Sequence, residues 1–422
     1  MAHAARPVTV RTQRRPWAEP ATEVQQRIPP LVGLVWALLI VNTLGSTGAV
    51  TVVPIPRSVI QMVTMGSLLS ALALALALNL GLRIQPSAYL LLLSLLLVVS
   101  CISSAYLESG YGALFRCFRL TIFVATLWLL TRWWDGSLTL VRHHIRVLGV
   151  VLVSVALGLV ISPGLAMPEI YGGRLVDAIW PLTPPQVGQY AAIVAGLTLM
   201  LWLGGRTDRW SAIVIVVPSI FLLMLSHTRT ATLGLIVGLT FAVGSLTLTS
   251  ARARRVFGWA VLVVGLVAVL LGPAVQAWFR RGQSEENFSN LTGRAKVWDA
   301  LLAEPRTMTE QLFGVGLTNK SFAGLPIDSS WLAIYHEQGY VGITIVAAFL
   351  CTLVVVAALR PPSLARACAV FLIVYCLSAS YTEAGLGDAS PYLLHLALAA
   401  SLLAKPRSAP AAAVGPPVRS AA

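Results

Sequence analysis

Arginine is the residue type that best equips this sequence to do chemistry. Arg116 and Arg119 stand three residues apart at one end of an apolar segment, so both project from the same side of a helix. Arg229 lies in a very tight turn between two apolar segments, and Arg174 lies in a loop rich in proline and glycine. A guanidinium stays charged, and its planar fork makes paired hydrogen bonds to phosphate oxygens. These residues therefore predict a pocket for a phosphate or pyrophosphate group.

The longest polar interval of the sequence, residues 291–342, holds further candidates. Arg294 and Lys296 stand at its start, where the residues that follow give a helical apolar face. Asp328 stands where the interval meets the next apolar segment, and we expect it to act as the N-cap carboxylate of the helix that begins there. Both ends of the interval thus carry charge beside the membrane.

Two more side chains are candidates for substrate binding. Glu337 lies about two turns inside the next apolar helix, where a buried acid needs an arginine or a substrate hydroxyl as its partner. His227 lies beside the tight turn that holds the arginine described above. The alternative for the arginines is contact with lipid headgroups or pairing with acids of the same side, namely Glu108, Asp177 and Glu383.

The sequence lacks the motifs of several other kinds of enzyme. It contains no Asp-x-Asp pair, no HExxH, no phosphate-binding loop and no GxSxG elbow. The five cysteines fall in apolar segments without metal-ligand spacing, so we expect them to pack as small hydrophobic residues. We therefore predict a reaction that uses neither a metal nor a cofactor.

The elements that must position these residues are membrane helices. Hydrophobic residues make up 57% of the chain and charged residues 11%, whereas soluble domains have about 45–50% and about 25%. Apolar runs of about 20 residues recur along most of the chain, each long enough to cross a bilayer as a helix. The composition predicts an all-α, polytopic integral membrane helical bundle.

We expect about twelve transmembrane helices, with one large extracytoplasmic loop over 275–329 between helices 9 and 10. The integral membrane domain covers 31–404, and the polar tails over 1–30 and 405–422 are expected to be disordered and cytoplasmic. The helices are predicted over 31–49, 59–80, 87–106, 113–131, 147–162, 188–204, 211–226, 230–249, 256–273, 330–358, 366–381 and 391–404.

The net charge of +14 is explained by topology. With both termini cytoplasmic, 19 of the 30 basic residues and only four acids fall on the cytoplasmic side. This is the positive-inside bias of membrane proteins. The charge requires no nucleic-acid partner; membrane lipids suffice, and the arginines singled out above fall on the extracytoplasmic side.

Four stretches resemble one known family. LTGRAKVWDALL followed by FGVGLTNKSF resembles the LTGRxxxW and GxG pattern of the O-antigen ligase and O-antigen polymerase superfamily. DSSWLAIYHEQGYVG is similar to that family's stretch that begins His-Asn and ends in a Glu-x-Gly-x-x-Gly helix. SHTRTATLG resembles its Ser-x-Ser-Arg-x-x-x-Leu-Gly turn, and GGRLVDAIWPLTPPQVG resembles its arginine-containing loop before helix 6.

The resemblance implies a bacterial membrane glycosyltransferase of the cytoplasmic (inner) membrane. Such enzymes transfer a glycan from an undecaprenyl-pyrophosphate-linked donor to a glycan or glycolipid acceptor at the outer face, without metal or nucleotide. Carried over by motif, Arg174 and Arg229 would bind the pyrophosphate, and Glu337 and Gly339 belong to the helix signature.

The sequence departs from the family at the residue usually proposed as the base. When Leu332 is aligned with the family's leucine, Asp328 takes the place of the histidine and Ser329 that of the asparagine. An aspartate can still orient an acceptor hydroxyl or remove its proton. Our hypothesis gives that role to Asp328 and pyrophosphate binding to the arginines Arg174, Arg229, Arg116 and Arg119.

Three alternatives stay open at this point. Within the family, the chain could act as a polymerase or as a ligase. From another class, a transporter or flippase of lipid-linked sugars would need charges reachable from both sides of the membrane, whereas the unexplained charges here gather on one side. A non-catalytic membrane scaffold would tolerate substitution of those arginines without any change in glycan products.

Overall fold

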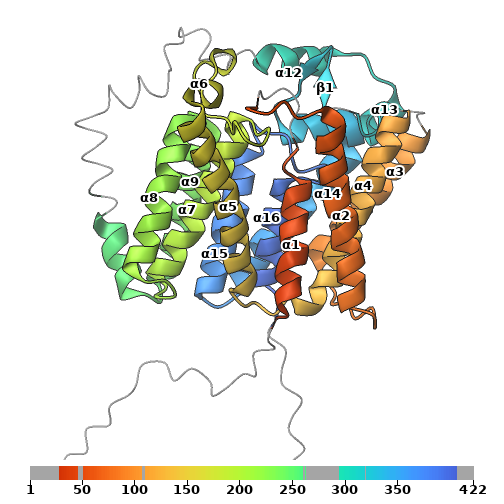
Figure 1. The fold of residues 1–422 in the computed structure, drawn as a ribbon. Helices are drawn as coiled ribbons and strands as arrows, with labels where there is room; N and C mark the ends of the chain where they lie inside the picture. The colour runs from red at the N-terminus through yellow and green to blue at the C-terminus, as the bar shows by residue number, and fades with distance from the viewer. Residues whose placement is uncertain are drawn as a thin grey trace, which may run out of the picture.

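The computed structural model of the chain is a bundle of helices that stand side by side (Figure 1). It describes residues 28–45, 51–106, 110–259, 262, 294–318 and 320–405. Most of the predicted tails, most of the helix expected over 256–273 and the first part of the predicted large loop lie outside the described residues.

Eight helices of the described chain are long and apolar enough to cross a membrane. They are α2 (Arg57–Leu78), α3 (Ala88–Tyr106), α4 (Tyr111–Leu130), α5 (Thr139–Ile161), α7 (Pro184–Leu203), α8 (Arg209–Ser226), α9 (Arg229–Thr247) and α14 (Ser330–Leu359). Three shorter apolar helices are α1 (Pro30–Asn42), α15 (Leu364–Ala379) and α16 (Pro391–Leu402). The predicted helical bundle with several membrane-length helices is confirmed, and the total of twelve stays a prediction.

Shorter elements join these helices. They are η1 (Thr131–Trp133), α6 (Pro163–Ala166), η2 (Glu169–Tyr171), α12 (Arg294–Ala303), α13 (Met308–Phe313) and the antiparallel pair β1 (Ser321–Phe322) and β2 (Leu325–Pro326). Of these, α6, α12, β1 and α13 lie together at one end of the bundle, which we call the loop end (Figure 1). The start of α1 and the end of the described chain after α16 lie at the opposite end, which we call the terminal end.

Two helix boundaries differ clearly from the prediction. Helix α5 begins at Thr139 rather than 147, so the basic stretch that we expected in a loop forms its first turns. This is possible because one face of that stretch is buried, His144 above all, while Arg142 and Arg146 stay exposed. Helix α1 ends at Asn42, seven residues before the predicted end at 49. There the side chain of Arg119 donates a hydrogen bond to the Asn42 carbonyl.

The helices pack in pairs around a shared core. Helix α14 packs on α3, α15 on α9, α7 on α8 and α1 on α2, and α7 and α16 are buried along nearly their whole length. The ring of Phe371 lies so close to Gly196 that a Cβ there would come within 2.1 Å of it. Small residues allow this close approach of helices inside a membrane.

A chain of polar side chains crosses the middle of the bundle. Trp36 donates to Nδ1 of His144 over 3.0 Å, and His144 Nε2 lies 3.1 Å from Nδ1 of His395. His395 Nε2 in turn lies 3.2 Å from the side-chain amide of Gln189. The Trp36 hydrogen makes Nδ1 of His144 an acceptor, so Nε2 of His144 donates to Nδ1 of His395. Nε2 of neutral His395 then carries a hydrogen, and Gln189 accepts it when its amide is turned so that the oxygen faces His395. The chain therefore ties α1, α5, α7 and α16 together without burying a charge.

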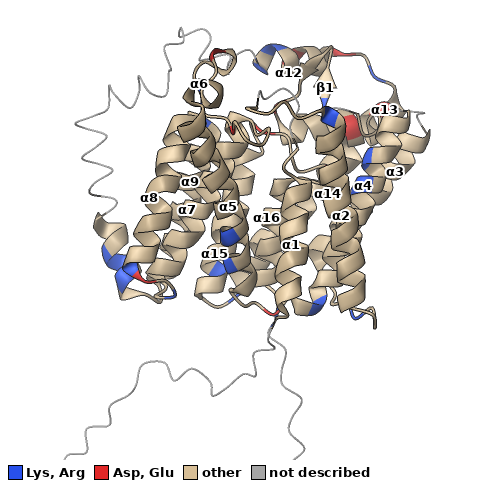
Figure 2. Ribbon diagram, in the orientation of Figure 1, with Lys and Arg blue, Asp and Glu red and all other residues tan. Residues whose placement is uncertain are grey.

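The two ends of the bundle differ in charge (Figure 2). Among the described residues, the terminal end carries twelve basic residues and two acids, whereas the loop end carries nine of each. The terminal-end residues are Arg83, Arg132, Arg142, Arg146, Arg206, Arg209, Arg252, Arg254, Arg255, Arg360, Arg366 and Lys405, with Asp135 and Asp208. The arrangement has the charge asymmetry of a membrane protein whose basic end faces the cytoplasm.

Candidate functional site

Helix α14 is broken near the loop end, and the break organises the site. Gly339 has φ 64° and ψ −162°, a conformation open almost only to glycine. The break frees the carbonyls of His336 and Glu337, which accept hydrogen bonds from the backbone N–H groups of Val315 and Gly316 over 2.9 and 3.0 Å. The start of α14 and the segment after α13 are thereby fixed to each other.

Glycine is required on both sides of this contact. A Cβ on Gly339 would lie 2.4 Å from the backbone of Leu312, and a Cβ on Gly314 would lie 2.3 Å from the backbone of Gln338. The stretches FGVG and HEQG, which the family resemblance singled out separately, are therefore complementary parts of one junction.

A group of four charged side chains lies beside this junction, and we call it the buried ion cluster: Arg116, Lys320, Glu337 and Asp388. The Nη1 group of Arg116 donates to Glu337 Oε1 over 2.8 Å, and its Nη2 group donates to Asp388 Oδ2 over 2.7 Å. The Glu337 and Asp388 side chains are 1% and 8% exposed. The arginine that we predicted to bind substrate thus holds two carboxylates of its own protein.

Lys320 completes the buried ion cluster. Its Nζ lies 3.7 Å from Asp388 Oδ2, and its backbone adopts φ 54°. Burial acts to raise the pKa of Asp388, but the charges of Arg116 and Lys320 outweigh it and hold that pKa well below its ordinary value. Burial lowers the pKa of Lys320, and Asp388 opposes the shift. The two positive and two negative charges of these four groups balance, and the positive charge of nearby Arg119 also acts on Asp388 and Lys320.

Arg119, the second arginine of the predicted pair on α4, also bonds within the protein. It donates to both the side-chain and the backbone oxygen of Asn42 over 3.1 and 2.8 Å. It thereby joins α4 to the end of α1.

A second group, which we call the arginine cluster, consists of Arg174, Arg229, Arg294, Asp328 and Glu383. Arg294 donates to Asp328 over 3.0 Å, with the two side chains 28% and 37% exposed. Arg174 donates to the Ser226 carbonyl over 3.1 Å and to the Thr228 hydroxyl over 3.3 Å. Three guanidiniums from three separate segments thus lie near enough to the two carboxylates, or to one another, to act on them electrostatically.

The ionisable groups of the arginine cluster are close enough to act on one another. Burial lowers the pKa of Arg174, Glu383 opposes this, and the like charges of Arg294 and Arg229 add to it. Burial raises the pKa of Glu383 to about 7, although Arg294 and Arg174 oppose the shift. Near neutral pH, the described residues of the cluster therefore bring three positive charges and fewer than two full negative charges.

Helix α12 covers this part of the loop end. Its Trp298 ring packs edge-on against Tyr381 with the ring centres 5.5 Å apart. Leu301 forms a small apolar cluster with Ile327 and Ala333. These contacts place Arg294 over the segment that carries Glu383.

The segment after α15 is held in place by hydroxyl groups. The Ser330 hydroxyl donates to the Glu383 carbonyl over 2.6 Å and accepts from the Gly385 N–H group over 2.9 Å. The hydroxyls of Thr230 and Thr382 are 2.6 Å apart, which joins this segment to the first turn of α9. The arginine cluster therefore rests on a fixed backbone.

Two expectations from the sequence need correction. Ser329 is the N-cap of α14, and Asp328 precedes it and accepts from Arg294 instead, because that guanidinium is within reach. Asp177, considered as an arginine partner, accepts from the Ser154 hydroxyl over 2.6 Å and from the Ile179 N–H group over 2.8 Å.

The remaining predicted residues lie at the loop end but in different settings. Lys296 is exposed on α12. His227 ends α8 with φ 47°, in the turn before Arg229. The single arginine pocket that the sequence suggested is thus divided into the arginine cluster and the buried ion cluster, which contains Glu337.

Two members of the buried ion cluster, Lys320 and Asp388, were missed by the sequence analysis. Asp388 had a readable signal, since it stands in the short GDASP turn between two apolar helices. Lys320 had none beyond its place in the polar interval.

No protein-family model matches the chain, and no curated protein matches it. Within the described residues, no group of three or more histidine, cysteine, aspartate or glutamate side chains could hold a metal ion.

Proposed function

We propose that the chain transfers a glycan from a polyprenyl-pyrophosphate-linked donor to the hydroxyl of a glycan or glycolipid acceptor at the loop end of the bundle. The observation that carries the proposal is the arginine cluster. Guanidiniums from a loop, from the start of α9 and from the start of α12 outnumber the carboxylates among them. The motif resemblance to O-antigen ligases and polymerases supports the same chemistry.

The arginines would stabilise the leaving group. When the bond between the anomeric carbon and the phosphate oxygen breaks, the electron pair leaves with the pyrophosphate. Cations already fixed in place favour this step because they need no rearrangement as the charge develops. Arg174, Arg229 and Arg294 fill this role in the proposal.

The two carboxylates of the cluster take different roles. As the acceptor oxygen bonds to the anomeric carbon, its proton must leave. We assign this role to Glu383, because a base works best when its pKa lies near the working pH, and burial raises that of Glu383 to about 7. Asp328 accepts from Arg294 through Oδ2, and in the proposal its carboxylate orients the acceptor hydroxyl.

The sidedness of the proposal follows from charge. A basic terminal end in the cytoplasm would put both termini inside and the arginine cluster at the outer face of the cytoplasmic membrane. A lipid-linked donor presented at that face reaches the cluster. A growing glycan as acceptor makes the protein a polymerase, and a glycolipid core as acceptor makes it a ligase.

Deletion of the gene followed by sizing of the surface glycan tests the proposal in the cell. Loss of long chains with single units retained identifies a polymerase, and accumulation of lipid-linked polymer identifies a ligase. Lipid-linked units trapped on the inner leaflet would instead identify a flippase and overturn the proposal.

Purified protein with a lipid-linked glycan and an acceptor gives the direct test. Arg174→Gln should lower the transfer rate about 100-fold, as the loss of one preorganised donor does at other sites. Arg57→Gln, which removes an exposed arginine from the same end, is the matched control and should keep the wild-type rate. Equal rates for both variants would contradict the proposed role of the arginine cluster.

A further inference from the structure

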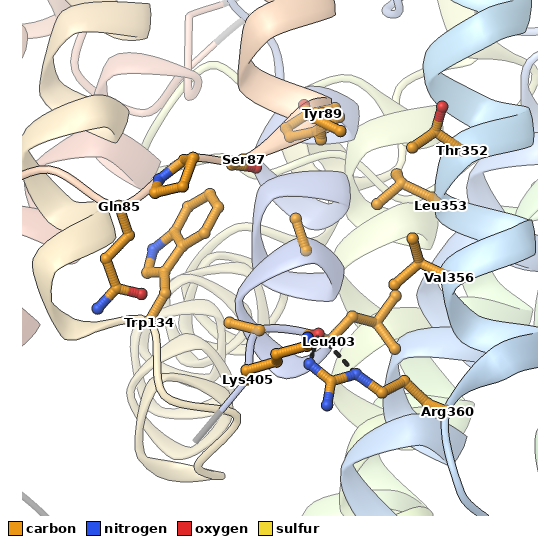
Figure 3. A pocket seen from close by; sticks show the side chains of 14 residues that line it. Gln85, Ser87, Tyr89, Trp134, Thr352, Leu353, Val356, Arg360, Leu403 and Lys405 are labelled. Carbon is orange, nitrogen blue, oxygen red and sulfur yellow. Dashed lines mark hydrogen bonds between the residues drawn. The ribbon is translucent and has the colours of Figure 1, made fainter. Parts of the chain in front are cut away.

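A pocket of about 570 Å³ opens at the terminal end, far from both charge clusters (Figure 3). Its walls come from the start of α3, the end of α14 and the end of α16. Thr352, Leu353 and Val356 of α14 line one side, and Trp134 lies on the facing side. The volume falls within the range of about 300–1,000 Å³ that is typical of ligand sites.

The pocket is apolar along its length and basic at one end. Arg360 and Lys405 lie at that end, one turn below Val356 (Figure 3). Thr352 and Arg360 are eight residues apart on α14, so the pocket runs roughly 12 Å along the helix axis. An occupant must therefore present an apolar part and an anionic part at a fixed spacing.

The guanidinium of Arg360 is held in position. Its Nε group donates to the Leu403 carbonyl over 3.0 Å, and its Nη2 group donates to the same oxygen. The Nη1 group takes no part in these bonds. The contact ties the end of α14 to the end of α16 and keeps the charge at the mouth of the pocket.

We propose that this pocket binds one anionic phospholipid of the surrounding leaflet, with its phosphate at Arg360 and Lys405 and an acyl chain along Leu353 and Val356. Arg360 directly follows the membrane-length helix α14, which is the depth at which headgroups lie. Basic pockets between membrane helices on the positively charged side are suited to anionic headgroups. The surplus of basic residues at the terminal end matches such a leaflet. The inference is independent of the proposed transfer reaction.

Native mass spectrometry of the full chain, released from nanodiscs with equal phosphatidylglycerol and phosphatidylcholine, tests the proposal. The wild type should retain one phosphatidylglycerol in preference to phosphatidylcholine. Lys405→Gln should weaken that retention about fivefold, since one cation near a headgroup contributes ~1 kcal/mol. Arg360→Gln should weaken it at least as much.

Two further variants separate the pocket from the general charge of this end. Thr352→Trp fills the apolar part and keeps both cations, so it should abolish lipid retention. Arg142→Gln removes a positive charge from the same end outside this pocket and should retain the lipid as the wild type does. If Arg360→Gln fails to fold because the contact with Leu403 is lost, Thr352→Trp and Lys405→Gln still test whether the lipid binds in this pocket. Equal retention of both lipids by the wild type, or wild-type retention by Thr352→Trp, overturns the proposal.

Discussion

The buried ion cluster and the arginine cluster use the same residue types at the same end of the bundle, yet they are built differently. In the buried ion cluster each carboxylate meets a cation, and the glutamate is 1% exposed. Among the described residues of the arginine cluster the three guanidiniums outnumber the two carboxylates, and the Arg294–Asp328 pair stays partly open to solvent. A neutralised, closed cluster suits the fold, and an open cluster with surplus charge suits an incoming anion.

The difference also separates two kinds of energetic contribution. Removal of one partner from a buried ion pair leaves an uncompensated charge in a low-dielectric environment, which is strongly destabilising. An exposed pair contributes little, because water solvates each partner when the other is lost. Stability measurements and activity measurements should therefore respond to different residues of the same end.

Replacement of Arg116 should have the largest effect on stability. Arg116→Met removes the cation that bonds to both Glu337 and Asp388, and we expect the free energy of unfolding to fall by about 3–5 kcal/mol. Thermal unfolding in detergent measures this. Adding Glu337→Gln and Asp388→Asn removes the stranded charges and should restore part of the loss. An Arg116→Met protein as stable as the wild type would mean that the cluster does not support the fold.

Replacement of Gly339 at the break in α14 should have the second-largest effect on stability. Gly339→Ala forces a residue with a Cβ into a conformation that costs about 1–3 kcal/mol and presses that Cβ against the backbone of Leu312. Unfolding temperature is the readout. Gly66→Ala is the matched control, since a Cβ there meets nothing within 4 Å. Similar stability of the two variants would show that the junction tolerates a side chain.

The arginine cluster should make the transfer rate depend on pH. If Glu383 accepts the proton, the transfer rate rises with pH and levels off above about 7, the value to which burial raises its pKa. At pH 6 only about one tenth of the carboxyl is ionised, so the rate should be about tenfold below its plateau. Glu383→Gln should lower the plateau and remove this dependence. A variant with the wild-type profile would assign the proton transfer to another group.

The smallest change in stability is expected at the partly exposed pair. Arg294→Gln should lower the free energy of unfolding by less than about 1 kcal/mol. The same variant should bind inorganic pyrophosphate more weakly, measured as weaker inhibition of transfer. A large loss of stability here would place Arg294 in the same class as Arg116 and remove the contrast between the two clusters.

The sequence predicts where most helices lie but only part of the site. The predicted span 211–226 differs by two residues from the observed α8, because a run of apolar residues is a local property of the chain. The end of α1 could not be predicted from local apolar runs, since the Arg119 side chain that donates to the Asn42 carbonyl comes from another helix.

The same limit applies to the charge clusters. The motifs predicted that Arg174 and Arg229 belong together, and Arg294 joins them in the structure. Arg116 belongs to the other cluster because it bonds to Asp388, which lies more than two hundred residues away in the sequence. A single sequence holds no sign of such a pairing. The roles of these residues in binding and catalysis stay predictions for the experiments above.

The shortness of two central helices has a consequence for where any reaction would occur. Helices α1 and α16 have 13 and 12 residues, so each is only roughly 20 Å long against a hydrocarbon thickness of about 30 Å. Arg116, which reaches the turn before α16, lies five residues inside α4, or roughly 8 Å from its end. Helices this short match a thinner hydrocarbon layer, so we expect the bilayer to thin around them. In the proposed reaction, a membrane-anchored diphosphate would then approach the loop end from within the lipid layer, whereas a water-soluble sugar chain would approach it from the solvent.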